Sequence, residues 1–209
     1  MESIHIVADS ISMHYGPYLE RYIKPFFHYS RKESTIGDLV NPEGQNGCDS
    51  KMVLNYLNKC VDQKMRWQFL IINCGLHDIR FANGGHQTDI NIYRSNLFKI
   101  LKIANKISNN IIWLRTTPVI DELHNTIRED IKRYNCDVEM YNKVADIVMN
   151  DNGFFVIDLY AFCKCLGGAE TYKDHIHFTD EARNLQGAFI SGYLISHLFH
   201  INGINLQSS

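Results

Sequence analysis

Short runs of consecutive apolar residues recur along this chain and constrain its fold more than any other feature. Runs typical of buried strands lie at residues 3–8, 68–73, 111–116 and 154–157, with a further candidate at 25–29. Helical patterns are predicted between and after them, at residues 14–23, 49–63, 89–107, 121–150 (in two pieces) and 179–199. Apolar strands that alternate with helices predict an α/β fold of three layers, in which helices cover both faces of a central parallel sheet.

The length of the chain is that of one ordinary domain. It has 209 residues, of which 45% are hydrophobic, and a chain of this size can bury a large core. We predict one domain over residues 1–205 and a short C-terminal tail at residues 206–209. The polar stretches at residues 31–48 and 77–88 are interpreted as loops.

Charge and hydropathy argue against two classes of partner. The formal net charge is only −2, whereas proteins that bind nucleic acids normally carry a clustered basic excess. No run approaches the 18 apolar residues that a membrane span needs. The N-terminus lacks the cationic start and apolar core of a secretory signal. We therefore expect a cytoplasmic protein with no nucleic-acid partner and no membrane span, and the oligomeric state stays open.

The residues that follow the predicted strands carry chemically useful side chains. In an open parallel sheet, binding sites form outside the carboxyl ends of the strands. Ser10 follows the first strand, His77 follows the strand at residues 68–73, and Asp174 and His177 precede the last helix. A hydroxyl, an imidazole and a carboxylate are the groups that acyl transfer needs.

Three short motifs resemble those of the SGNH (GDSL-type) hydrolases. Residues 7–12, Val-Ala-Asp-Ser-Ile-Ser, resemble the first block of that family, Gly-Asp-Ser-x-Ser/Thr. Residues 75–78, Gly-Leu-His-Asp, look like the third block, Gly-x-Asn-Asp, and Asp174 and His177 match the fifth, Asp-x-x-His. The order is right, and the resemblance spans residues 4 to about 199. It implies a flavodoxin-like α/β/α fold and hydrolysis of esters or thioesters.

The same residues support a serine nucleophile on chemical grounds. A serine hydroxyl attacks poorly until a base accepts its proton, and His177 could be that base for Ser10. Asp174 lies within one turn of His177 and could orient its ring. The N–H of Ser10 could donate to a developing oxyanion, because it lies where a strand enters a helix. This mechanism needs no cofactor.

Two positions depart from the family pattern. Ala8 replaces a glycine, and His77 replaces the asparagine that normally donates a side-chain N–H to the oxyanion. A neutral histidine still donates one N–H, so we expect His77 to take this role, although its bulk could also mark a weakened site. In the second block, a backbone N–H is expected from either Gly47 or Cys48.

Each of these residues also has a structural interpretation. Ser10 could cap a helix, and His177 could be an interior histidine. Asp9 and Asp78 could hold loops through backbone amides, but they are also candidates for the pocket lining, as is Arg80.

A zinc site is the alternative to the catalytic interpretation of His177. Four soft ligands lie within a short stretch, and they are Cys163, Cys165, His175 and His177. Their spacing is not that of common zinc modules, so we expect no metal.

Two polar stretches near the predicted site indicate a class of substrate. The stretches at residues 41–49 and 80–87 are polar, which favours a small acyl group, such as acetyl, on a polar carrier such as a carbohydrate. The alternatives are an O-acyltransferase with the same triad, a thioesterase or lipase-like acylhydrolase, and a non-catalytic binding module.

Overall fold

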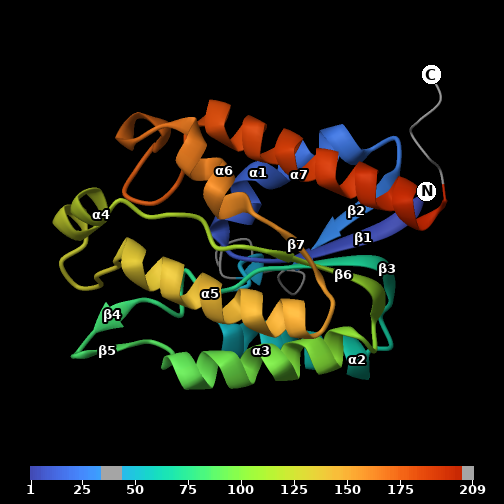
Figure 1. The fold of residues 1–209 in the computed structure, drawn as a ribbon, viewed down its shortest axis with the longest axis horizontal. Helices are drawn as coiled ribbons and strands as arrows, with labels where there is room; N and C mark the ends of the chain where they lie inside the picture. Colours follow the sequence, from blue (N-terminus) through green and yellow to red (C-terminus); the bar gives the residue numbers. More distant parts are fainter. Residues whose placement is uncertain (34–43, 204–209) are drawn as a thin grey trace.

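Five parallel strands form the centre of the protein. The structure is a computed structural model, and it describes residues 1–33 and 44–203. The strands lie in the order β2-β1-β3-β6-β7, and every neighbouring pair is parallel. Their bounds are β1 (Glu2–Val7), β2 (Phe27–Arg31), β3 (Trp67–Ile72), β6 (Ser108–Leu114) and β7 (Phe155–Ile157). Helices lie on both faces of this sheet (Figure 1), which confirms the predicted three-layer α/β fold.

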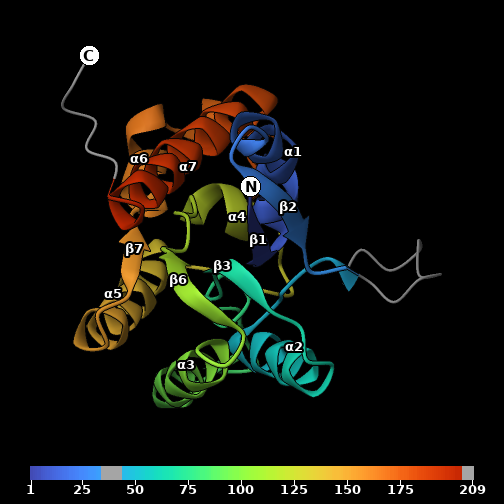
Figure 2. The same cartoon turned by 90° about the vertical axis from the view of Figure 1, so that its right-hand side faces the viewer.

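The two helical layers are built from different parts of the chain (Figure 2). One face is covered by α1 (Ser10–Ile23), α6 (Leu159–Leu166) and α7 (Asp180–Ile201), so the chain ends pack together. The other face is covered by α2 (Ser50–Asp62), α3 (Ile90–Ala104) and α5 (Asn135–Asp151). No helix in the described ranges is long and apolar enough to cross a membrane.

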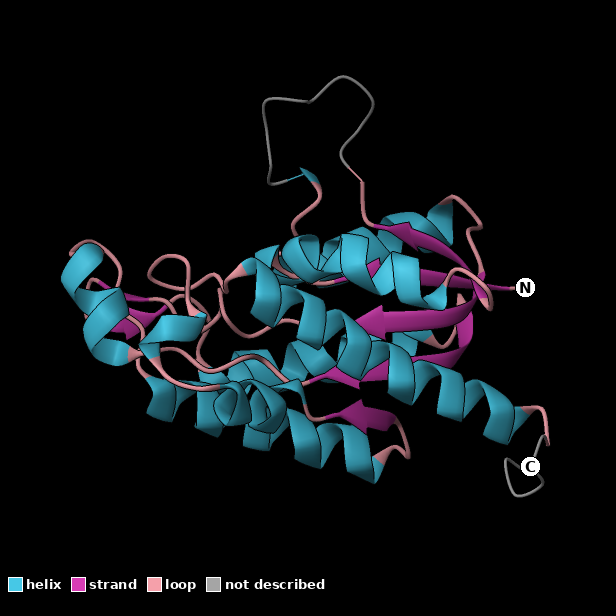
Figure 3. Cartoon of the chain, turned by 90° about the horizontal axis from the view of Figure 1, so that it is seen from above, coloured by secondary structure: helices cyan, strands magenta, loops and turns pink. Residues whose placement is uncertain are grey.

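Beyond the carboxyl ends of the strands lies an extra layer of short elements (Figure 3). It contains the hairpin of β4 (Phe81–Ala82) and β5 (Gly85–His86) and the short helix α4 (Asp121–Ile127). The chain therefore builds additional structure at the end of the sheet where an α/β site is expected.

The structure corrects several predicted elements. The first helix begins at Ser10 instead of residue 14, because the carboxylate of Asp9 accepts the N–H of Ile11 and caps it. Helix α6 was not predicted; Asp158 caps it through the N–H of Ala161. The predicted loop at residues 77–88 contains the β4–β5 hairpin.

Parts of three other expectations lie outside the described residues. They are the tail at residues 206–209, the end of the predicted domain at residue 205, and much of the predicted loop at residues 31–48.

The three central strands β1, β3 and β6 are buried on both faces over most of their length, as their composition requires. Ile4, Ile6, Leu70, Ile71 and Ile112 are all fully buried. The hydrophobic effect thus drives these strands into the middle layer, whereas their amino-terminal ends and the edge strands β2 and β7 are partly exposed.

A buried histidine on β1 makes stability depend on pH. His5 is 3% exposed, its two ring nitrogens lie 2.8 Å from Ser30 Oγ and 2.9 Å from Tyr56 Oη, and its ring stacks on Trp67. Burial, assisted by the charge of Arg31, lowers its pKa to about 3.

We expect this histidine to weaken the fold in acid. The unfolded chain binds the proton near pH 6.5, but the folded protein binds it only near pH 3. Stability is therefore unaffected by His5 above pH 6.5 and falls as the pH is lowered from there to 3, by about 1.4 kcal/mol per pH unit. Urea titrations of wild type and His5→Gln between pH 7 and pH 4.5 measure this, and equal pH slopes for the two proteins would contradict it.

Candidate active site

Ser10, His177 and Asp174 meet outside the carboxyl end of β1. Ser10 is the first residue of α1, and the other two lie in the loop before α7. The Ser10 Oγ lies 3.0 Å from His177 Nε2, and His177 Nδ1 lies 2.8 Å from Asp174 Oδ2. The fold thus brings together, in hydrogen-bonding order, the three residues predicted as catalytic, although 167 positions separate Ser10 from His177.

The carboxylate of Asp174 organises this loop. Its Oδ1 accepts the N–H groups of Ile176 and His177, at 2.9 and 2.8 Å. Burial alone would raise the pKa of Asp174, but these hydrogen bonds and the one from the His177 ring together lower it to about 2. Because the charged Asp174 accepts from His177 Nδ1, the Nε2 atom is left to accept the proton of Ser10.

The ring of His14 on α1 supports His177 from the side. The two ring centroids lie 4.5 Å apart in an edge-to-face arrangement. Burial, followed by the charge of His177, lowers the pKa of His14 to about 4. His14 is therefore neutral at physiological pH and adds no charge next to the base.

Comparison with solved structures shows the same architecture in known hydrolases. The chain is similar to a lipase/acylhydrolase from Enterococcus faecalis, with a TM-score of 0.71 and 17% identity over 94% of this chain and 97% of that one. It is also similar to a GDSL-like lipase from Bacteroides thetaiotaomicron, with a TM-score of 0.67 and 14% identity over 94% and 89% of the two chains. This is the SGNH hydrolase fold.

A third structure with the SGNH fold is a carbohydrate acetylesterase from Sinorhizobium meliloti, with a TM-score of 0.64 and 12% identity. The match covers 94% of this chain and 99% of that one. No protein-family profile matches the chain, and no curated protein sequence matches it.

The backbone donors expected from the second block of the SGNH pattern already have acceptors. The N–H of Gly47 donates to the carbonyl of Ala8 at 2.8 Å, and that of Cys48 donates to Asn46 Oδ1 at 2.8 Å. A side chain at Gly47 would meet the Ala8 carbonyl oxygen at 3.0 Å, so this glycine serves close backbone packing. In this conformation both N–H groups are engaged within the protein, and an oxyanion role for Gly47 or Cys48 stays a prediction.

Ser10 and His77 are the remaining predicted oxyanion donors. Within the described residues, the N–H of Ser10 has no acceptor, and it lies at the positive end of α1. His77 follows β3 and is 9% exposed. Burial, followed by the charges of Arg80 and Arg133, lowers its pKa to about 3. His77 is thus a neutral imidazole with one N–H to donate.

The turn that carries His77 is shaped by Gly75. Its φ is +146°, and a side chain there would overlap the hydroxyl of Thr116. That hydroxyl donates to the carbonyl of Cys74 at 3.1 Å and holds the turn against the end of β6.

Asp78, predicted as a pocket candidate, does not reach solvent. It is fully buried and accepts hydrogen bonds from the N–H and the hydroxyl of Ser50, at 3.0 and 2.6 Å. The physical reason is that the first N–H groups of α2 need an acceptor. Asp78 therefore joins the His77 turn to α2. Arg80 is half-buried and lies within electrostatic range of His77.

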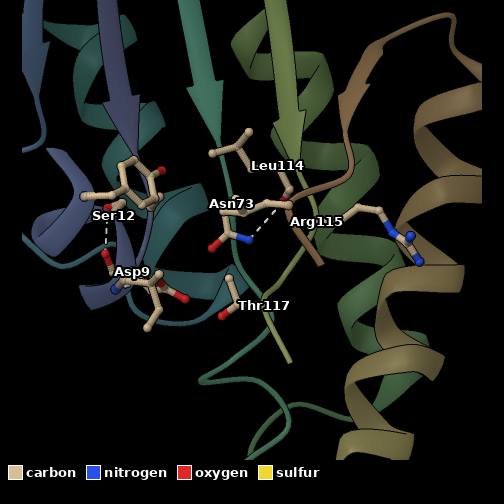
Figure 4. Close-up of a pocket in the computed structure, with 10 residues that line it drawn as sticks. Asp9, Ser12, Asn73, Leu114, Arg115 and Thr117 are labelled. Atoms are coloured by element: carbon tan, nitrogen blue, oxygen red, sulfur yellow. Dashed lines mark hydrogen bonds between the residues drawn. The ribbon is translucent and has the colours of Figure 1, made fainter. Parts of the chain in front are cut away.

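Asp9 lines a cavity of only about 10 Å³ (Figure 4), which has room for roughly one water molecule. Ser12, Asn73 and Thr117 also line it. Asn73 donates to the carbonyl of Leu114 at 2.9 Å. This cavity is too small for a substrate, so Asp9 acts in the structure as the cap of α1.

The zinc ligands considered from the sequence do not converge. Cys163 is buried and accepts from Gln186 Nε2 at 3.2 Å, whereas His177 contacts Ser10 and Asp174. Among the residues that the structure describes, no group of three or more His, Cys, Asp or Glu side chains could hold a metal.

A buried group next to the triad was not singled out from the sequence. His124 on α4 and Arg133 before α5 lie in a stretch that was predicted as helix, without a functional motif. His175 contacts His124, with their Nδ1 atoms 3.0 Å apart. No sequence signal pairs these residues, because the contact depends on how α4 packs above the sheet.

Proposed function

We propose that this protein is an SGNH hydrolase that cleaves a carboxylic ester through an acyl-enzyme on Ser10. The observation that carries the proposal is the continuous chain of hydrogen bonds from Asp174 to His177 to Ser10. The similarity to esterases and lipases of the same fold supports it.

The geometry suits a two-step reaction. His177 Nε2 accepts the hydroxyl proton while Ser10 Oγ attacks the ester carbonyl. The charge that develops on the carbonyl oxygen is stabilised by the N–H of Ser10 and the ring N–H of His77. His177 then gives its proton to the leaving alcohol, and Asp174 stabilises the intermediate imidazolium. A water molecule, deprotonated by the same base, releases the acid.

A short acyl group on a polar carrier is the substrate class we favour. His14 and His175 lie beside His177, and Arg80 lies within electrostatic range of His77, so polar side chains that suit a polar carrier surround the reacting groups. One structure of the same fold is described as a carbohydrate acetylesterase. We expect p-nitrophenyl acetate to be hydrolysed with a higher kcat/KM than the octanoate, and a clear preference for eight carbons or more would contradict this.

Covalent labelling tests the proposed nucleophile directly. A fluorophosphonate probe reacts only with an activated and accessible serine, so it should label the wild type. It should fail to label Ser10→Ala and should still label Ser12→Ala, in which the neighbouring serine is removed. Absence of labelling of the wild type between pH 6 and pH 9 would count against the proposal.

A further inference from the structure

A buried positive charge, that of Arg133, lies near the triad and forms no ion pair within the part of the chain that the structure describes. Arg133 is 5% exposed. Burial, followed by the charge of Arg80, lowers its pKa to about 9, so it is still cationic at neutral pH. A buried charge without a counter-ion is costly.

The guanidinium of Arg133 joins the His77 turn to helix α4. Its Nε donates to the carbonyl of Leu76 at 2.7 Å, next to His77. Its Nη1 lies 3.1 Å from Nε2 of His124, which is fully buried. These contacts use two of the five N–H groups of a guanidinium. The other three have no partner among the described residues.

The same contacts determine where the protons of two histidines lie. A guanidinium only donates, so His124 Nε2 must accept and its Nδ1 must carry the hydrogen. His124 Nδ1 therefore donates to His175 Nδ1, 3.0 Å away. It follows that His175 carries its own hydrogen on Nε2. His175 is half-buried, and its ring centroid is 6.5 Å from that of His177.

The carboxylates around this group form no ion pair with Arg133. Asp130 binds Arg128 through two hydrogen bonds of 2.9 Å, and Asp174 is bound to His177. Asp9 is 3% exposed and lies within electrostatic range of Arg133, but its carboxylate caps α1 by accepting the N–H of Ile11. Among the described residues, no carboxylate therefore occupies the remaining N–H groups of Arg133.

We propose that Arg133 and His175 form a recognition site for a carboxylate on the ester substrate, beside Ser10. The planar N–H fork of arginine matches a carboxylate, and the N–H of His175 adds a third donor. A carboxylate also matches the single positive charge, whereas a phosphate monoester carries about −1.5 to −2 at neutral pH. The proposal rests on the proposed function only in that the carboxylate belongs to the ester.

Direct binding tests the site without any need for turnover. Benzoate, benzamide and phenyl phosphate are titrated into the wild type by calorimetry. Benzoate should bind about tenfold more tightly than benzamide, which has the same shape but no charge. Arg133→Gln should remove this difference. Arg66→Gln, which removes the same charge at the opposite end of β3, should retain it.

Three results would overturn the proposal. They are equal binding of benzoate and benzamide to the wild type, an unchanged difference in Arg133→Gln, and tighter binding of phenyl phosphate than of benzoate. If Arg133→Gln does not fold, as judged by thermal unfolding, His175→Asn is used instead. That side chain is half-buried, and its replacement should reduce the benzoate preference partially. No reduction would contradict the role of His175.

Rates of hydrolysis test whether the carboxylate site acts on an ester substrate. We expect kcat/KM for 3-acetoxybenzoate to exceed that for 3-acetoxybenzamide about tenfold in the wild type and to equal it in Arg133→Gln. If the wild type binds benzoate selectively but hydrolyses neither ester, the carboxylate site stands and the proposed esterase activity fails. If it hydrolyses both equally, the activity stands and the carboxylate site fails.

Discussion

Ser10→Ala should reduce the kcat for p-nitrophenyl acetate by about 10⁴-fold or more, the scale on which loss of a serine nucleophile acts in such triads. The side chain of Ser10 has one hydrogen bond within the described residues, to His177. Alanine is well tolerated in the first turn of a helix. The fold should therefore survive, and thermal unfolding should change by only a few degrees.

Ser12→Ala is the matched control for this variant. Ser12 lies two positions further along α1, and its hydroxyl donates to the carbonyl of Asp9 at 2.6 Å. Its loss should reduce stability by about 1 kcal/mol and leave kcat within about tenfold of the wild type. Equal losses of activity in the two variants would show that the region matters for structure alone. Retention of a tenth of the activity in Ser10→Ala would rule out Ser10 as the nucleophile.

His77→Ala should lower kcat by about 10²- to 10³-fold, the range for removal of one oxyanion donor. KM should change little, because the donor acts mainly on the transition state. We expect His77 to contribute much of the stabilisation of the oxyanion, because the N–H groups of Gly47 and Cys48 already have acceptors in the protein.

His77→Asn should retain most of the activity, since an amide also offers an N–H. Because the pKa of His77 is about 3, its donor stays neutral from pH 5 upward. The ratio of wild-type to His77→Ala activity should therefore not change between pH 5 and pH 9. His28→Ala, an exposed site on β2, serves as the control. Wild-type rates in both His77 variants would show that His77 donates nothing to the reaction.

The predictions for Ser10 and His77 both depend on the fold, which places the proposed catalytic residues at one edge of the sheet. Ser10 is placed by β1, His77 by β3, and His177 by the loop before α7. All three were expected at this edge, since the carboxyl ends of parallel strands lie together. The structure adds the hydrogen-bonding order and the neutral state of His77.

Other features of the site could not be predicted in this way. The start of α1 at Ser10 depends on the cap that Asp9 provides, whereas a helical pattern starts only where apolar spacing begins. The pairing of Gly47 with Ala8 depends on two loops passing closely. Patterns in a sequence report local periodicity, and neither contact is periodic.

The fold class and the candidate triad could be predicted from residue patterns, because strand burial and the spacing of Asp174 and His177 are local properties of the chain. The surroundings of Ser10 follow from long-range packing. His124 meets His175 across 51 positions, and Arg133 meets Leu76 across 57. Such contacts, and the burial that keeps His77 neutral while Arg133 retains its charge, depend on packing between elements distant in sequence.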